Sequence, residues 1–209
     1  MGTYGYISII AMLCYGFLLL MFLTAKRNRI INSFLVVLTG LLFWTGGSAF
    51  MRAQLWPGCE FWYQVSLLGI LLLPYAYYRF ILAFGGVRNG SVGRIYLVTM
   101  LICFWVNVQF GVFLEAPKMI EKRGVQTFVY EITPSIIVFF IPAGLFLIHL
   151  FVILVRICKE NPTMKVQYEP VMMGVLALFL GNAFLGIPFF SGFPIDILSG
   201  VVNVFLLFY

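Results

Sequence analysis

The residues able to carry acid–base, nucleophilic or metal chemistry are few in this chain of 209 residues. It contains a single histidine, His149, with seven acidic residues and the four cysteines Cys14, Cys59, Cys103 and Cys158. Hydrolysis or group transfer needs a nucleophile beside a base, or a cluster of metal ligands. His149 has no second His, Cys or carboxylate at a helical metal-binding spacing. The sequence therefore predicts no catalytic centre and no metal site, and it implies no cofactor.

Another group of residues stands out because polar and aromatic side chains occur inside long apolar runs. Strongly polar side chains at membrane depth are costly, so they indicate a cavity or the interior of a helical bundle. An aromatic-lined pocket with a few polar groups is typical of a small-molecule site. The predicted ligand-binding residues are Trp44, Gln64, Trp105, Gln109, Asn182, Asp196 and Asn203.

The spacing of these residues limits which of them can act together. Asp196 and Asn203 are seven positions apart, so they share one helical face, which we expect to look inward. Hydrogen bonding between helices is the alternative role for Asn182 and Asn203, because amide side chains often join helices in lipid. Glycines such as Gly47 and Gly174 indicate close helix packing, since small residues let backbones approach.

The ligand-binding set lies in the outer half or the centre of the predicted helices, whereas a second predicted set, Arg79, His149 and Glu169, lies toward their inner ends. We expect these residues to couple the helical bundle to a domain on the inner side of the membrane. The alternative for Arg79 is that its aliphatic stem follows the apolar surface and its charged end reaches the membrane boundary.

The elements that must position these residues follow from composition. The chain is 63% hydrophobic and 10% charged, with a mean hydropathy of +1.05, which excludes a water-soluble globular surface. Apolar runs lie at residues 4–23, 33–51, 62–84, 94–114, 133–157, 170–190 and 195–209. In lipid such runs form helices, because no water is present to pair the backbone. The predicted fold class is all-α, an integral membrane bundle of seven transmembrane helices.

Basic residues predict the orientation of the bundle, because they accumulate in cytoplasmic loops. Of the 13 Lys and Arg residues, nine lie at one set of helix ends: Lys26, Arg27, Arg29, Arg79, Arg88, Arg94, Arg156, Lys159 and Lys165. The other four are Arg52, Lys118, Lys122 and Arg123. We therefore expect the N-terminus outside and the C-terminus in the cytoplasm. Anionic cytoplasmic lipid accounts for the net charge of +6 and makes a nucleic-acid partner unnecessary.

Two segments outside this simple pattern carry further expectations. In the outer loop, residues 125–130 alternate as a strand does after the turn-forming Lys122, Arg123 and Gly124, which predicts a short outer hairpin between helices four and five. A disordered loop is the alternative. The last apolar run has fifteen residues, about 22 Å of helix, whereas the hydrocarbon core is about 30 Å thick. We therefore expect an output domain beyond Tyr209, with residues 1–209 forming one seven-helix domain.

Diffuse motifs along nearly the whole chain suggest a family. Asn28 and Asn32 precede LLFWTGG at residues 41–47, and Trp62 and Pro74 precede FILAFG at residues 80–85. A basic stretch before Gln167 is followed by GVLALFLG at 174–181 and GIP at 186–188. This pattern resembles the N-terminal seven-helix sensor region of bacterial membrane histidine kinases, a module also found ahead of diguanylate cyclase domains.

The resemblance implies a sensor region in the bacterial cytoplasmic (inner) membrane that is not itself an enzyme. Such a region senses an outside or membrane-dissolved signal, and we expect this chain to bind a small amphipathic or apolar ligand from the outer face or the lipid. It signals to a cytoplasmic histidine kinase or diguanylate cyclase domain, through which it forms a homodimer. The family supplies no motif that assigns ligand residues in this chain.

A small-solute membrane transporter is the alternative function, because polar residues at mid-membrane suit a substrate path. The first three and last three apolar runs show no evident internal repeat of the kind common in transporters. A retinal photoreceptor needs a lysine in the last helix for its Schiff base, and residues 195–209 contain none.

Overall fold

The structure is a computed structural model that describes residues 5–87, 90–122, 125–129, 134–160, 165–184 and 195–208. Within these residues the chain forms seven α-helices, one short 3-10 helix and one pair of strands. The elements in chain order are α1 (Gly5–Leu23), α2 (Arg29–Arg52), α3 (Cys59–Phe84), α4 (Ser91–Phe110), β1 (Lys118–Lys122), β2 (Val125–Val129), η1 (Pro134–Ile136), α5 (Ile137–Glu160), α6 (Lys165–Phe184) and α7 (Ile195–Phe208).

Five of the helices in the described residues are long and apolar enough to cross a membrane, namely α1 to α5. In the described chain α7 is 14 residues long. Helix α6 begins with Lys165, Gln167 and Glu169, which lower its hydropathy. Several apolar helices of this length are typical of a multi-pass membrane protein.

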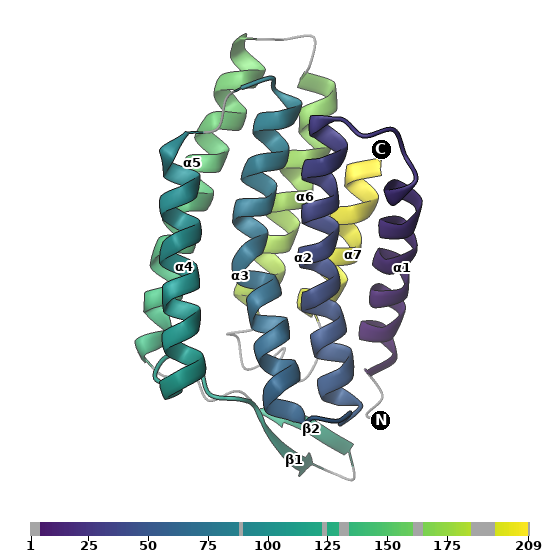
Figure 1. Cartoon of the computed structure of the whole chain (residues 1–209), viewed down its shortest axis with the longest axis vertical. Coiled ribbons are helices and arrows are strands. Elements are labelled where there is room, and N and C mark those ends of the chain that lie inside the picture. Colours follow the sequence, from purple (N-terminus) through teal and green to yellow (C-terminus); the bar gives the residue numbers. More distant parts are fainter. Residues whose placement is uncertain are drawn as a thin grey trace.

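The helices stand roughly side by side in one bundle, with α2 and α3 at its centre (Figure 1). Helix α1 packs against α2 and α7, whereas α4 and α5 pack against α3 and against each other. Helix α6 packs against α5 and α7. The N-terminal end of α1 and the strand pair lie at one end of the bundle, and α7 ends at the other (Figure 1).

Glycines bring the backbones of α2 and α3 into direct contact. A Cβ atom added to Gly47 would lie 2.5 Å from the backbone nitrogen of Ser66 and 2.7 Å from the carbonyl oxygen of Trp62. One added to Gly69 would lie 2.8 Å from the carbonyl oxygen of Gly40. The Ser66 hydroxyl donates a hydrogen bond of 2.9 Å to the Trp44 carbonyl across the same contact. No larger side chain fits at these positions without separating the helices.

Helix α2 starts earlier, and α4 ends earlier, than hydropathy predicts. Asn28 caps α2, since its side chain accepts a 2.7 Å hydrogen bond from the Ile31 N–H; this cap lets the helix begin at Arg29 rather than at residue 33. Helix α4 ends at Phe110 rather than at residue 114 because Gly111 is left-handed, with φ of 61°.

Asn107 holds the chain that leaves α4. Its buried side-chain oxygen accepts hydrogen bonds from the backbone N–H groups of Phe113 at 3.0 Å and Leu114 at 2.8 Å, and its amide nitrogen donates to the Leu114 carbonyl at 3.1 Å. Strands β1 and β2 follow and pair antiparallel, with Lys118 opposite Val129. The pair lies in the loop where the sequence predicts a hairpin.

Replacing Asn107 by leucine should loosen this loop. Two backbone N–H groups lose their acceptor, and each loss costs about 1–3 kcal/mol where the group stays buried. Deuterium uptake at residues 111–122, measured by hydrogen-exchange mass spectrometry, should rise at least several-fold. The control is Gln109→Leu, two positions away, because this side chain is exposed. Equal uptake in the two variants would contradict the role given to Asn107.

Candidate functional site

The structure separates the predicted ligand-binding residues into different surroundings. Trp44 and Asn203 are buried in the bundle, 3% and 0% exposed, and Gln64 is half-buried between α3 and α4. Trp105 is 61% exposed, and Gln109 is also exposed. The side chains of Asn182 and Asp196 lie outside what the structure describes.

Helix α4 turns Trp105 and Gln109 away from the bundle, so the structure does not bring them together with Trp44. The buried face of α4 contains Tyr96, Met100 and Asn107. At about 100° per residue, position 109 lies opposite Met100 and position 105 more than a quarter turn from it.

A buried hydrogen bond joins α3 and α7, and Tyr15 of α1 lies against α7. The Tyr77 hydroxyl donates a hydrogen bond to the side-chain oxygen of Asn203. A Cβ atom added to Gly200, one turn before Asn203, would lie 2.9 Å from the Tyr15 hydroxyl and 3.4 Å from the Trp44 ring. Tyr15, Tyr77 and Asn203 form what we call the inner polar cluster.

The inner polar cluster is incompletely paired. The Tyr15 hydroxyl and the Asn203 amide nitrogen are buried and have no hydrogen-bond partner among the described residues. The amide nitrogen of Asn203 lies 2.8 Å from where a Cβ atom of Gly174 on α6 would stand. A buried polar group without a partner is costly, so these two groups carry unused hydrogen-bonding capacity. Asn203 was a predicted site residue; Tyr15 and Tyr77 were missed, although a tyrosine within an apolar run signals a hydroxyl that needs a partner.

Gln64 lines a groove between α3 and α4 at the end of the bundle that holds β1 and β2. The groove is open on one side and has a volume of about 730 Å³. Leu68, Phe104 and Val108 form apolar walls, and Glu60 lies one turn of α3 before Gln64. The side-chain oxygen of Gln64 is buried and has no hydrogen-bond partner in the described part of the chain.

The three predicted coupling residues lie on three helices. His149 of α5 is half-buried, with its ring centroid 6.2 Å from that of Tyr78. The Arg79 guanidinium lies 6.0 Å from the ring centroid of Tyr75, within reach of a cation–π contact. Glu169 is exposed on α6. Within the described residues no hydrogen bond, ion pair or ring contact links these three side chains to one another, so the structure does not assemble them into one network.

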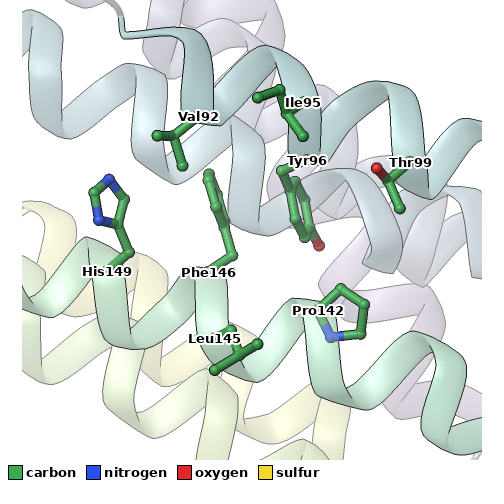
Figure 2. Close-up of a pocket in the computed structure, with 8 residues that line it drawn as sticks. All are labelled: Val92, Ile95, Tyr96, Thr99, Pro142, Leu145, Phe146 and His149. Atoms are coloured by element: carbon green, nitrogen blue, oxygen red, sulfur yellow. The ribbon is translucent and has the colours of Figure 1, made fainter.

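A second groove lies between α4 and α5 and contains His149 (Figure 2). It encloses about 320 Å³ and is lined mainly by apolar and aromatic side chains. Among the described residues, no group of three or more His, Cys, Asp and Glu side chains is placed to hold a metal ion.

Comparison with known proteins identifies a family. The sequence model of the family described as the N-terminal 7TM region of histidine kinase matches residues 7–209. No curated protein and no solved structure matches the chain.

Proposed function

The chain belongs to the family of N-terminal 7TM regions of histidine kinases, and from this premise we propose that it senses a small amphipathic or apolar ligand in the membrane. The family region is not itself catalytic, and this chain contains no enzymatic domain. The proposed role is therefore to bind the ligand and to pass the signal on to a separate catalytic domain.

All seven helices cross the bacterial inner membrane in this proposal, with the N-terminus outside and the C-terminus in the cytoplasm. The family match supports seven crossings. The opposite placement of the start of α1 and the end of α7 also supports them, because an odd number of crossings puts the two ends on opposite sides (Figure 1). The bias of Lys and Arg supports the direction.

The ligand binds in the α3–α4 groove. The observation that carries this assignment is the buried side-chain oxygen of Gln64, which lines an otherwise largely apolar groove and has no partner among the described residues. A polar group of the ligand pairs with Gln64, and the apolar part lies against Leu68 and Phe104.

The signal then travels along α3 to α7. Gln64 and Tyr77 lie on the same helix, about 20 Å apart at about 1.5 Å per residue, and Tyr77 bonds Asn203 on α7. A ligand acts only if it binds two arrangements of the bundle unequally. The inner polar cluster offers a second arrangement, because Tyr15 and the Asn203 nitrogen have unused hydrogen-bonding capacity.

The output in this proposal is a cytoplasmic histidine kinase domain, through which two copies of the protein form a homodimer. The family description supports a histidine kinase. A diguanylate cyclase domain is the alternative output, and reading the coding sequence beyond Tyr209 distinguishes the two.

Replacing Gln64 by leucine should weaken ligand retention about tenfold or more, because the ligand's polar group loses its partner while it stays buried. Protein purified from bacterial membranes is extracted with solvent, and the co-purified small molecules are quantified by mass spectrometry. Gln109→Leu makes the same change on an exposed face and should retain them like wild type. A small molecule retained equally by Gln64→Leu, or none retained by wild type, would rule out the groove. Saturable solute flux in liposomes would instead support the transporter.

A further inference from the structure

The α4–α5 groove opens on the side of the bundle. Ile95 of α4 and Leu145 of α5 line it and are 64% and 63% exposed. Both helices are apolar enough to span a membrane, so these faces meet lipid. A molecule that enters this groove must therefore be dissolved in the membrane.

Two stacked aromatic rings form the middle of the groove. The rings of Tyr96 and Phe146 are nearly parallel, with an interplanar angle of 10° and centroids 4.1 Å apart. The Tyr96 hydroxyl points into the bundle and donates a 3.2 Å hydrogen bond to the Leu71 carbonyl. Tyr96 and Phe146 are 6% and 4% exposed, so only a small edge of the stacked pair faces the groove.

The free polar groups of the groove lie at its two ends. Figure 2 shows His149 opposite Val92 at one end and Thr99 with Pro142 at the other, with Tyr96 and Phe146 between them. Val92 and Thr99 are seven residues apart on α4, so the two ends are separated by about 10 Å of helix axis. Among the described residues, neither the Thr99 hydroxyl nor the His149 imidazole makes a hydrogen bond.

We infer that the α4–α5 groove is a second binding site, which takes a lipid-dissolved quinone or quinol. A molecule of this class has a flat ring with oxygen atoms on opposite sides, and it carries an apolar tail. The ring lies between Ile95 and Leu145, across the edge of the Tyr96–Phe146 pair, and its two oxygens pair with Thr99 and His149 at the two ends. Both side chains can donate to a quinone carbonyl and accept from a quinol hydroxyl.

Simpler membrane amphiphiles match the groove less well. A fatty alcohol has one polar end, so it can pair with Thr99 or with His149 but leaves the other group without a partner in an apolar setting. An unpaired polar group away from water costs free energy. A molecule that pairs with both Thr99 and His149 is therefore favoured. The distance between the two ends of the groove is too long for one hydroxyl group to pair with both side chains.

This site is separate from the α3–α4 groove, so the inference does not depend on the proposed sensing of another ligand there. The two grooves share no lining residue. Gln64→Leu should consequently bind a quinone as wild type does.

The test measures binding of decylubiquinone to the protein in lipid nanodiscs. Empty nanodiscs give the background of quinone dissolved in lipid. After size-exclusion chromatography, the quinone is extracted and quantified by its absorbance. We expect saturable binding above background, and at least tenfold weaker binding of decan-1-ol, which has the same alkyl chain and one hydroxyl group.

Variants then locate the site. Thr99→Val and His149→Leu should each weaken decylubiquinone binding about tenfold, and His149→Gln, which keeps a hydrogen-bonding group, should weaken it less. Thr39→Val is the control, because the Thr39 hydroxyl bonds the Leu35 carbonyl within α2, away from the groove. Thermal unfolding of each variant shows whether it is folded. Absence of saturable binding to wild type, equal binding of decan-1-ol, or unchanged binding in both Thr99→Val and folded His149→Leu would overturn the inference.

Discussion

Replacing Gly69 by alanine is expected to disrupt the packing of α2 on α3 and to destabilise the bundle strongly. The new Cβ would overlap the backbone nitrogen of Trp44 and lie 2.8 Å from the Gly40 carbonyl oxygen. Both are backbone atoms of a central helix, so they cannot rotate aside as a side chain does. Overpacking typically costs 1–3 kcal/mol, and here we expect about 3 kcal/mol or more.

The measurement for Gly69→Ala is thermal unfolding of the purified protein in detergent, together with its size-exclusion profile. We expect a large fall in Tm and a loss of monodisperse protein. Gly144→Ala is the matched control, because no atom lies within 4 Å of its added Cβ. Alanine is the better helix former by about 1 kcal/mol, so this variant should be as stable as wild type or slightly more so. A wild-type Tm for Gly69→Ala would show that the helices are not in backbone contact.

Replacing Asn203 by leucine should release α7 from α3. The buried Tyr77 hydroxyl would lose its acceptor, at a cost of about 1–3 kcal/mol. Tyr77→Phe should cost a similar amount, because it leaves the Asn203 oxygen unpaired in the interior. The double variant should cost less than the sum of the two, since it removes both members of the pair.

The double-mutant cycle for Tyr77 and Asn203 uses thermal or denaturant unfolding in detergent. We expect a coupling energy of about 1 kcal/mol or more. Tyr6→Phe controls for loss of a tyrosine hydroxyl, because Tyr6 is 60% exposed on α1. Additive effects of the two single variants would show that Tyr77 and Asn203 do not interact. In that case the proposed path from the α3–α4 groove to α7 would lose its physical link.

Hydropathy predicts the helices well because lipid requires long apolar segments, but it does not predict where they end. Seven apolar runs correspond to seven α-helices in the described residues. The boundaries of α2 and α4 depend instead on Asn28, which caps a helix, and on Gly111, which adopts a left-handed conformation. Apolar residues such as Phe113 and Leu114 lie beyond Gly111, so hydropathy continues after the helix has ended.

The side chains of the site are harder to predict because each depends on how a helix is rotated. Packing fixes the rotation of α4. Gly93 lies directly on the Tyr78 ring, and the Asn107 side chain accepts a hydrogen bond from Phe113 in the loop that follows α4. These contacts direct Trp105 and Gln109 outward, and the sequence contains no signal strong enough to choose that face. Gln64 and Asn203 have clearer surroundings, since each places an amide among buried apolar residues.

The family is the part of the functional interpretation that the sequence predicted and the comparison confirms. The resemblance to the sensor region of histidine kinases rests on diffuse motifs, and the family model matches residues 7–209. The ligand and the output domain stay predictions, because neither is encoded in a residue pattern that chemistry alone can interpret.

The glycine contacts between α2 and α3 also bear on how force moves through the molecule. Where the backbones touch at Gly47 and Gly69, no side chains separate the two helices. Helices α2 and α3 should therefore move together as one rigid body around these contacts, with the α3–α4 groove near one end. A displacement of α3 at the groove would then move α2 with it over this part of the bundle, instead of being absorbed by repacking of side chains between the two helices.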